Sequence, residues 1–320
     1  MDIVRHRHDT TSTVGGIFCG MGAGAVWGLV FLAPELARAF SPLQLTIGRY
    51  LSYGAVSAVL ILPRWRALAH SVTRREWIAL GWLALAGNTL YYILLSSAVQ
   101  LGGIAMTSLV IGFLPVAVTI IGSRDQGAVP LPRLAPSLLL CAAGALCIGW
   151  QALTPSAGGF QRQQIAGLLC AIGALASWTS YAVGNSRWLA RLDHISAHDW
   201  SLLIGIVTGA QALLLIPIAA VIGVEQHDKL AWMQFAEVSL GVALLASIAG
   251  NALWNRMSRL LPLTLIGQMI LFETLFALLY GFAWEQRLPR PLETTSFACV
   301  ILSVAACISA HRKPALLAAA

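Results

Sequence analysis

The chain has 320 residues, of which 58% are hydrophobic and only 10% charged, and its mean hydropathy is +0.77. Soluble domains carry about 25% charged residues, so this composition argues against a soluble globular domain and predicts an all-α, polytopic membrane protein. The net charge of +7 does not indicate nucleic-acid binding, because no contiguous basic face is present and basic residues of membrane proteins mainly set topology.

Apolar runs long enough to cross a bilayer, about 20 residues each, predict ten transmembrane helices joined by short loops. These helices are expected at residues 14–33, 43–63, 77–98, 103–122, 134–151, 165–186, 200–222, 236–255, 263–284 and 293–310. We expect tails at 1–13 and 311–320, and no cleavable signal peptide.

Basic residues gather in the loops of one side, for example Arg64, Arg74, Arg187 and Arg259, and are sparse on the other. Loops rich in Arg and Lys stay in the cytoplasm. We therefore predict a bacterial inner-membrane protein with both termini in the cytoplasm and the lipid bilayer around its helices.

The two halves of the chain look like copies of each other. The third predicted helix contains 87–91 (Gly-Asn-Thr-Leu-Tyr) and the eighth contains 250–254 (Gly-Asn-Ala-Leu-Trp), while Trp27 in the first helix matches Trp178 in the sixth. This similarity predicts two five-helix repeats, at 14–155 and 160–310. Five is an odd number, so the second copy should lie inverted, and inverted repeats place a substrate site near the membrane midplane.

The order and spacing of short motifs resemble the drug/metabolite transporter superfamily, in its EamA-type ten-helix branch. The motifs are Trp27-Gly28, Gly48-Arg49-Tyr50, the approach to Pro115, Leu261-Pro262 and Glu285. The resemblance implies inverted five-helix repeats around a central cavity and transport of small metabolites, with amino-acid exporters as the most similar members. Many relatives have Pro where this chain has Glu273, so inference from the family stops at that position.

Glu273 lies near the middle of the apolar run 263–284. An ionisable group at membrane depth is costly and usually functional. Burial favours its neutral form, so Glu273 is a candidate for proton coupling or for binding a substrate amine. The alternative is a protonated Glu273 that is hydrogen-bonded to a neighbouring helix.

Arg49 is the second charge inside a predicted helix. One interpretation is a ligand for a substrate carboxylate, which the guanidinium fork can bind in a bidentate manner. The other is a side chain that extends to the membrane interface or pairs with a helix-end carbonyl. The position of Arg49 near the start of its helix favours the second interpretation.

Polar and aromatic side chains at helical spacing form candidate walls for the cavity. The proposed lining residues, together with Glu273, are Trp27, Asn88, Tyr91, Tyr92, Trp178, Tyr181, Asn251, Trp254 and Gln268. Amides, hydroxyls and flat aromatic faces suit a zwitterionic or partly apolar metabolite. The same residues could instead hold helices together by hydrogen bonds and packing.

No motif for ATP, a cofactor or an enzyme active site is recognised. The pair His194 and His198 lacks further metal ligands, and Asp199 is expected to cap the next helix. The sequence therefore predicts a secondary transporter of small molecules without cofactor or metal, with protons as a candidate coupling ion. The competing hypotheses are a nucleotide-sugar or lipid-linked carrier on the same fold and an intramembrane lipid enzyme, for which converging catalytic groups are missing.

Overall fold

The computed structural model describes residues 2–124, 129–153, 162–222, 227–284, 286, 288–289 and 291–312, and these residues contain helices and no strand. The first predicted half contains α1 (Asp2–Gly28), η1 (Leu29–Phe31), α2 (Ala33–Leu36), α3 (Pro42–Ile61), η2 (Leu62–Arg64), α4 (Trp65–Ser71), α5 (Arg74–Ala84), η3 (Leu85–Thr89), α6 (Leu90–Ile111), α7 (Leu114–Gly122) and α8 (Leu131–Leu153). The second contains α9 (Arg162–Leu189), α10 (Ala197–Ile222), α11 (Lys229–Val242), η4 (Ala243–Gly250), α12 (Asn251–Leu260), α13 (Leu263–Met269), α14 (Leu271–Trp284) and α15 (Pro291–Arg312).

Within the described residues, seven helical stretches are long and apolar enough to cross a membrane. Shorter apolar helices occupy 131–144 and 294–310. These stretches agree with a polytopic helical membrane protein, whereas the predicted count of ten transmembrane helices stays a prediction. The predicted boundary between the two repeats, at 155–160, lies outside the described residues.

Local signals in the sequence explain where several helices begin. Ser41 and Gln44 form a reciprocal capping box ahead of α3, with Pro42 at the first helical position. Thr73 and Glu76 form the same arrangement at the start of α5. Such caps satisfy backbone N–H groups that have no partner inside the helix.

Three expected boundaries are corrected by the structure. Helix α1 begins at Asp2, so the polar segment expected to be a tail continues the first helix. The cap of α10 is Ser196, whose hydroxyl accepts from the Asp199 amide at 3.0 Å, and Asp199 is instead its acidic partner. The expected helix 263–284 is divided at Ile270 into α13 and α14.

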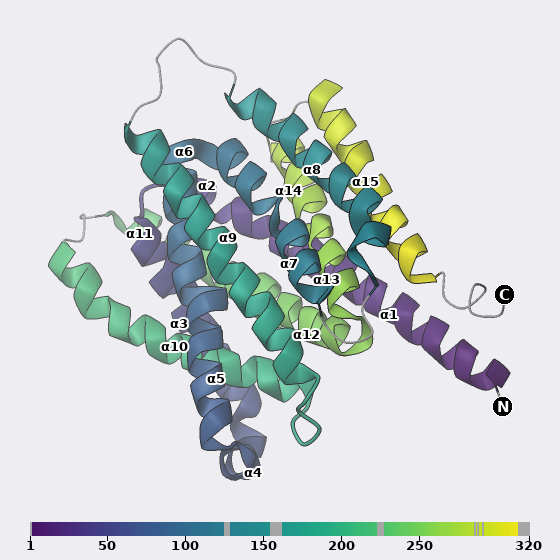
Figure 1. The fold of residues 1–320 in the computed structure, drawn as a ribbon. Helices are drawn as coiled ribbons and strands as arrows, with labels where there is room; N and C mark the ends of the chain where they lie inside the picture. The colour runs from purple at the N-terminus through teal and green to yellow at the C-terminus, as the bar shows by residue number, and fades with distance from the viewer. Residues whose placement is uncertain are drawn as a thin grey trace.

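The expected loop near residue 100 is a bend inside α6. Ala98 and Val110 belong to one small hydrophobic cluster with Ala171, yet a straight helix would separate two residues twelve positions apart by about 18 Å. The chain therefore bends sharply between them, as Figure 1 shows near the α6 label. This bend brings α7 back against α9 and α13.

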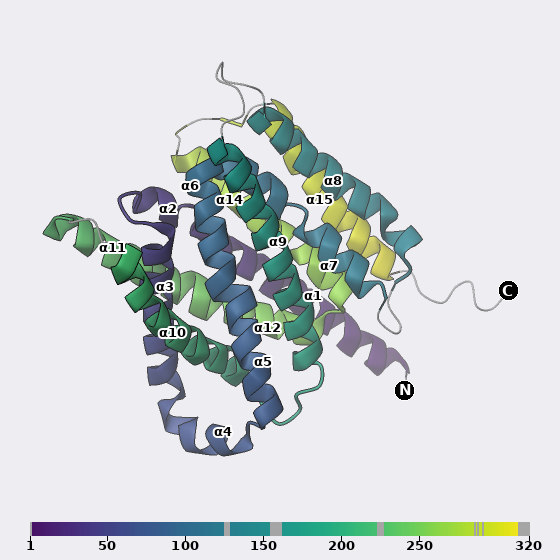
Figure 2. The ribbon, with the colours of Figure 1, turned by 60° about the vertical axis from the view of Figure 1, so that its left-hand side comes forward.

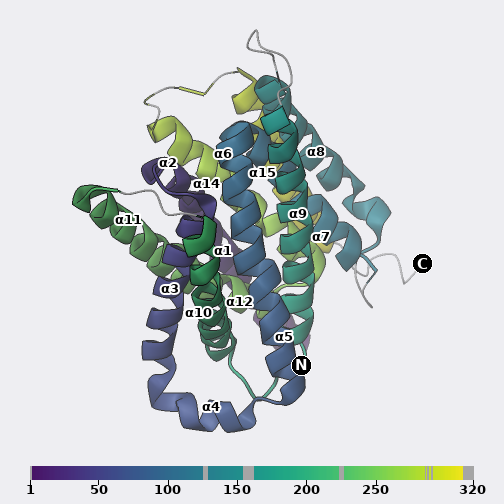
Figure 3. The same ribbon diagram turned by 90° about the vertical axis from the view of Figure 1, so that its left-hand side faces the viewer.

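The helices pair in a pattern that agrees with the predicted repeat. Equivalent helices of the two halves contact each other, since α3 packs on α10 and α8 on α15, and α7 also packs on α13. Helix α1 crosses to α12 and α14 of the second half, and α9 crosses to α6 of the first. Figures 1 and 2 show α8 and α15 side by side on one flank, and Figure 3 shows α4 joining the lower ends of α3 and α5.

Candidate functional site

A small cavity lies where helices from both halves meet. It is lined by Trp27, Val30, Arg49, Tyr50, Gly87, Asn88, Tyr91, Trp178, Tyr181, Asn251 and Glu273. About 20 Å³ of it is open to the centre of a water molecule, which is room for about one water. The cavity is thus narrow around its polar groups in this conformation.

The structure brings most of the predicted site residues into this cavity. Those that line it are Trp27, Asn88, Tyr91, Trp178, Tyr181, Asn251 and Glu273. Trp254 lies behind the lining, with ring centroids 5.1 Å from Trp27 and 5.2 Å from Trp178. The aromatic wall is therefore a continuous cluster contributed by α1, α9 and α12.

Gln268 lies elsewhere. Its side chain donates to the Thr119 hydroxyl at 3.3 Å and accepts from the Ser303 hydroxyl at 3.0 Å. These bonds join α13 to α7 and α15, so in this structure Gln268 has the packing role that was the alternative interpretation.

Arg49 points into the cavity, against the interpretation favoured from sequence. Its side chain is buried, and Nε donates to the Ser247 hydroxyl at 3.1 Å. The guanidinium carbon lies 4.5 Å from the ring centroid of Tyr92 and 5.1 Å from that of Tyr50, distances at which a cation is attracted to an aromatic ring. Tyr92, a predicted lining residue, therefore supports Arg49 instead of lining the cavity.

One part of the Arg49 guanidinium has no protein partner. Its Nη1 atom is buried without a hydrogen bond. A buried donor in this state costs free energy, and more so when it is charged. An anionic group entering the cavity would satisfy it.

Glu273 faces the same cavity from the second half. Its side chain is 6% exposed, and it lies in the first turn of α14 because the helix restarts at Leu271. The amino-terminal end of a helix favours a carboxylate. Among the described residues, no ion pair joins Glu273 to Arg49, so the two opposite charges are presented to the cavity separately.

A close approach of α1 to α14 sets the position of Glu273. A Cβ atom on Gly24 would stand 2.6 Å from Phe272 Cβ and 2.8 Å from the Glu273 backbone nitrogen. Any larger residue would force the two backbones apart. Gly24 therefore allows α1 to pack directly behind the carboxylate.

Two π-helical segments place the asparagines of the site. In η3, the Ala86 carbonyl accepts from the Ser177 hydroxyl at 2.7 Å, and in η4, the Ala246 carbonyl accepts from Trp27 Nε1 at 2.9 Å. Such segments leave carbonyls without their usual helical donor and often occur at functional sites. Asn88 lies within η3, and Asn251 directly follows η4.

Each asparagine is fixed by the other half of the chain. Asn88 Nδ2 donates to the Thr208 hydroxyl at 3.2 Å, and Asn251 Nδ2 donates to the Tyr53 hydroxyl at 3.3 Å. The two amide groups are thereby oriented with their carbonyl oxygens available. This arrangement combines the two readings from sequence, because the same side chains hold helices together and line the cavity.

Residues 14–150 match the EamA-like transporter family. The chain is 28% identical to the inner membrane protein YtfF of Escherichia coli (strain K12) over 319 residues, which covers 94% of this chain and 96% of that protein. The first half of the chain therefore carries an EamA-like domain. The chain is also similar to a solved crystal structure, with a TM-score of 0.71 at 20% identity over 93% of this chain and 98% of the other.

These similarities agree with the superfamily inferred from the motifs and indicate a membrane transporter of small molecules. The family match spans the first predicted half of the chain, including Trp27, Arg49 and Asn88. Trp178 and Glu273 come from the second half and complete the same cavity.

Proposed function

We propose that this protein exports amino acids or similar small metabolites across the cytoplasmic membrane by alternating access. The observation that carries the proposal is that Arg49 and Glu273, with opposite charges, face one aromatic-walled cavity. Arg49 would bind the substrate carboxylate, and Glu273 would bind its amine or a proton. Energy would come from ion or substrate gradients.

The dimensions of the cavity support a moving mechanism. With room for about one water, the present conformation holds no amino acid. Helices must separate to admit a substrate, and inverted repeats open toward alternate sides by rocking around a fixed midplane site. We therefore propose that the cavity must widen in the transport cycle before it binds a substrate.

The charge of the lining supports amino acids over the competing nucleotide-sugar carrier. Among the described lining residues, Arg49 is the single basic side chain. Two phosphates would call for several Arg or Lys side chains. A zwitterion needs one cation and one anion, which the cavity has.

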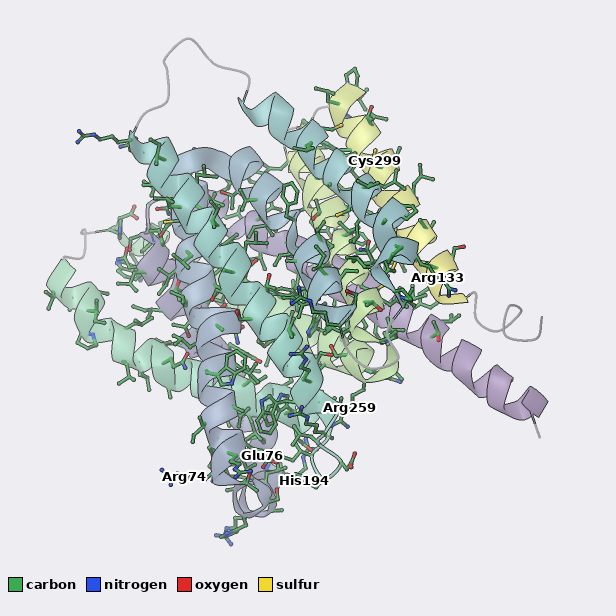
Figure 4. All side chains as sticks on the ribbon, in the orientation of Figure 1. Arg74, Glu76, Arg133, His194, Arg259 and Cys299 are labelled. Carbon is green, nitrogen blue, oxygen red and sulfur yellow. The ribbon has the colours of Figure 1, made fainter. Side chains whose placement is uncertain are left out.

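The orientation of export rests on the basic end, which we define as the end of the bundle that carries Arg64, Arg74, Arg187 and Arg259. Figure 4 shows Arg74, Glu76 and His194 together at this end. The Arg64–Asp199 ion pair at 2.8 Å and the Glu76–His194 pair at 3.4 Å join its loops. Because basic loops stay inside the cell, we propose that this end and both termini face the cytoplasm.

Counterflow in proteoliposomes tests the proposal. Vesicles are loaded with the twenty common amino acids, labelled amino acids are added outside at equal pH, and uptake is measured. We expect saturable exchange that Asn88→Ala weakens, while Gln163→Ala on the exposed start of α9 leaves it unchanged. Absence of exchange by every amino acid, in protein shown to be folded, would remove the amino-acid substrate class.

A further inference from the structure

A second, larger cavity of about 470 Å³ opens at the basic end. It lies between the carboxyl end of α9, the loop that follows it and the junction of α12 with α13. The residues that give it its chemistry are Ser186, Arg187, Asp193, Ser258, Arg259 and Leu263. Figure 4 shows Arg259 above the loop that carries His194.

The lining of this cavity combines both charges with an apolar wall. Arg187 and Arg259 are exposed cations, Asp193 is an exposed anion, and Leu263 is a buried apolar contact. The guanidinium of Arg259 donates to the Leu192 carbonyl at 3.0 Å and to the Ile195 carbonyl, which fixes its position. Paired opposite charges beside an apolar wall match a zwitterion with a hydrophobic side chain.

The lining also contains a buried hydroxyl group that lacks a hydrogen-bond partner. The Ser258 side chain is only 6% exposed, and its hydroxyl has no hydrogen-bond partner. Buried hydroxyls in proteins are nearly always bonded. A ligand carboxylate or amine in the cavity would supply the missing partner.

The same helix faces connect this cavity to the central one. On α12, Asn251 lines the central cavity and Ser258 lines the outer one, and Asn255 lies between them. These residues share one face because they are spaced four and then three positions apart. Seven residues of helix rise about 10 Å, so Asn251 and Ser258 lie about 10 Å apart along the axis of α12.

A hydrogen-bonded plug separates the two cavities. Asn185 Nδ2 donates to Asn255 Oδ1 at 2.7 Å, and Trp200 Nε1 donates to Asn185 Oδ1 at 3.0 Å. Asn185 and Asn255 are completely buried. A path along α12 from the outer cavity to the central one would require this α9–α12 contact to open.

We infer that the cavity at the basic end is an entry site, where the amino-acid substrate binds before it passes the Asn185–Asn255 plug. This inference rests on the proposed function. Arg187 and Arg259 bind the carboxylate, Asp193 binds the amine and Leu263 contacts the side chain. Asp193 favours a zwitterion over a phosphate, which its charge would repel.

Protection of a cysteine at position 258 tests the entry site. Purified full-length Ser258→Cys protein is labelled with a charged methanethiosulfonate reagent, with and without the twenty common amino acids. Mass spectrometry of the peptide carrying residue 258 separates this label from that on the six native cysteines. We expect saturating amino acids to slow labelling by about tenfold, as expected when about 90% of the sites are occupied. Ser186→Cys is the substitute if the first variant does not fold.

Three further substitutions in the labelled protein locate the protecting site. Arg187→Gln should abolish protection, whereas Arg191→Gln, which changes an exposed arginine outside the lining, should preserve it. Arg49→Gln disables the central cavity and should also preserve protection.

The outcomes separate the two proposals. Loss of protection in Arg49→Gln would assign it to the central site and overturn the entry site. Wild-type exchange without protection of residue 258 would overturn the entry site and leave the transport proposal standing. Neither exchange nor protection would overturn both, and protection without exchange would support the entry site and count against transport.

Discussion

The two predicted halves of the transporter share a scaffold but differ in charge. In each half, a π-helical segment lies at a cavity asparagine: η3 contains Asn88, and η4 is followed by Asn251. A side chain of the other half receives the hydrogen bond of each asparagine. The partners are equivalent as well: Tyr53 precedes Gly54 in α3, and Thr208 precedes Gly209 in α10. The two glycines face each other where α3 and α10 cross.

The charges have no such counterparts. Arg49 lies five residues before Gly54, and the residue five before Gly209 is Ile204. Glu273 corresponds in the repeat to Pro115. The contacts between helices therefore occur in both halves, whereas each of the two charges occurs in only one half. A cavity with its cation on one half and its anion on the other can hold a dipolar substrate in a single orientation.

Replacing Glu273 tests the largest expected effect. Glu273→Gln keeps the shape of the side chain and removes its charge and its titratable proton, so we expect proton movement with the substrate to be abolished and counterflow exchange to be weakened. A pH-sensitive dye inside proteoliposomes measures the proton movement during substrate uptake. Glu237→Gln, which changes an exposed carboxylate on α11, is the control. Unchanged proton flux in Glu273→Gln would refute proton coupling at this residue.

Removing the cation should nearly stop exchange. Arg49→Gln leaves a substrate carboxylate without its charged partner, which costs about 3 kcal/mol and corresponds to about a hundredfold lower affinity. Arg49→Lys keeps the charge but loses the fork, so its loss should be intermediate. Initial counterflow rates over a range of substrate concentrations provide the measurement.

The exposed Arg66→Gln is the matched control for a lost positive charge. If Arg49→Gln exchanges substrate at the same rate as this control, Arg49 does not bind the substrate carboxylate, and the two halves do not each bind one charge of the substrate. The carboxylate would then have to be bound elsewhere in the protein.

The sequence was sufficient for the features that depend on composition and helical spacing. Apolar runs predicted helices, and the matched segments around Asn88 and Asn251 predicted that both would meet at one site; in the structure, both line the same cavity. This success has a physical cause: residues on one helix face stay together when the helix packs. Trp27 and Trp178 were found by the same repeat logic.

The missed features depend on contacts between distant segments. Distance from a helix end suggested that Arg49 reaches the interface, but Ser247 and Tyr92 hold it in the cavity. Gln268 was assigned to the cavity as a polar residue in an apolar run, and in the structure it lies in α13, separated from Glu273 by the break at Ile270. A π-helical segment changes which residues share a face, and no periodicity in a single sequence marks it.

Alanine at the facing glycines tests whether the scaffold is equivalent in the two halves. A Cβ atom on Gly54 would stand 2.6 Å from Gly209 Cα, and one on Gly209 would stand 2.7 Å from Gly54 Cα. Since backbone cannot move aside as a side chain can, each substitution should destabilise the protein by about 1–3 kcal/mol. Thermal unfolding in detergent measures both, and we expect similar losses.

Gly81→Ala and Gly241→Ala are the controls, because a Cβ atom at either position meets nothing within 4 Å. Alanine is the better helix former, so these variants should unfold at the same temperature or higher. A large difference between the losses at Gly54 and Gly209 would contradict an equivalent α3–α10 crossing.

The smallest expected effect concerns the carbonyl exposed by η4. Trp27→Phe keeps an aromatic ring and removes the N–H that donates to the Ala246 carbonyl, which should cost about 1 kcal/mol. Trp254 is the natural control, since it packs in the same cluster but its Nε1 atom has no partner. Trp254→Phe loses comparable ring area and no hydrogen bond, so the difference between the two unfolding temperatures isolates the bond. Equal shifts would mean that packing alone holds α1 against η4. A larger shift for Trp27→Phe would mean that η4 depends on its hydrogen bond from α1, as η3 is bonded by Ser177 of α9. The first helix of each predicted half would then stabilise the π-helical segment that positions the asparagine of the other half.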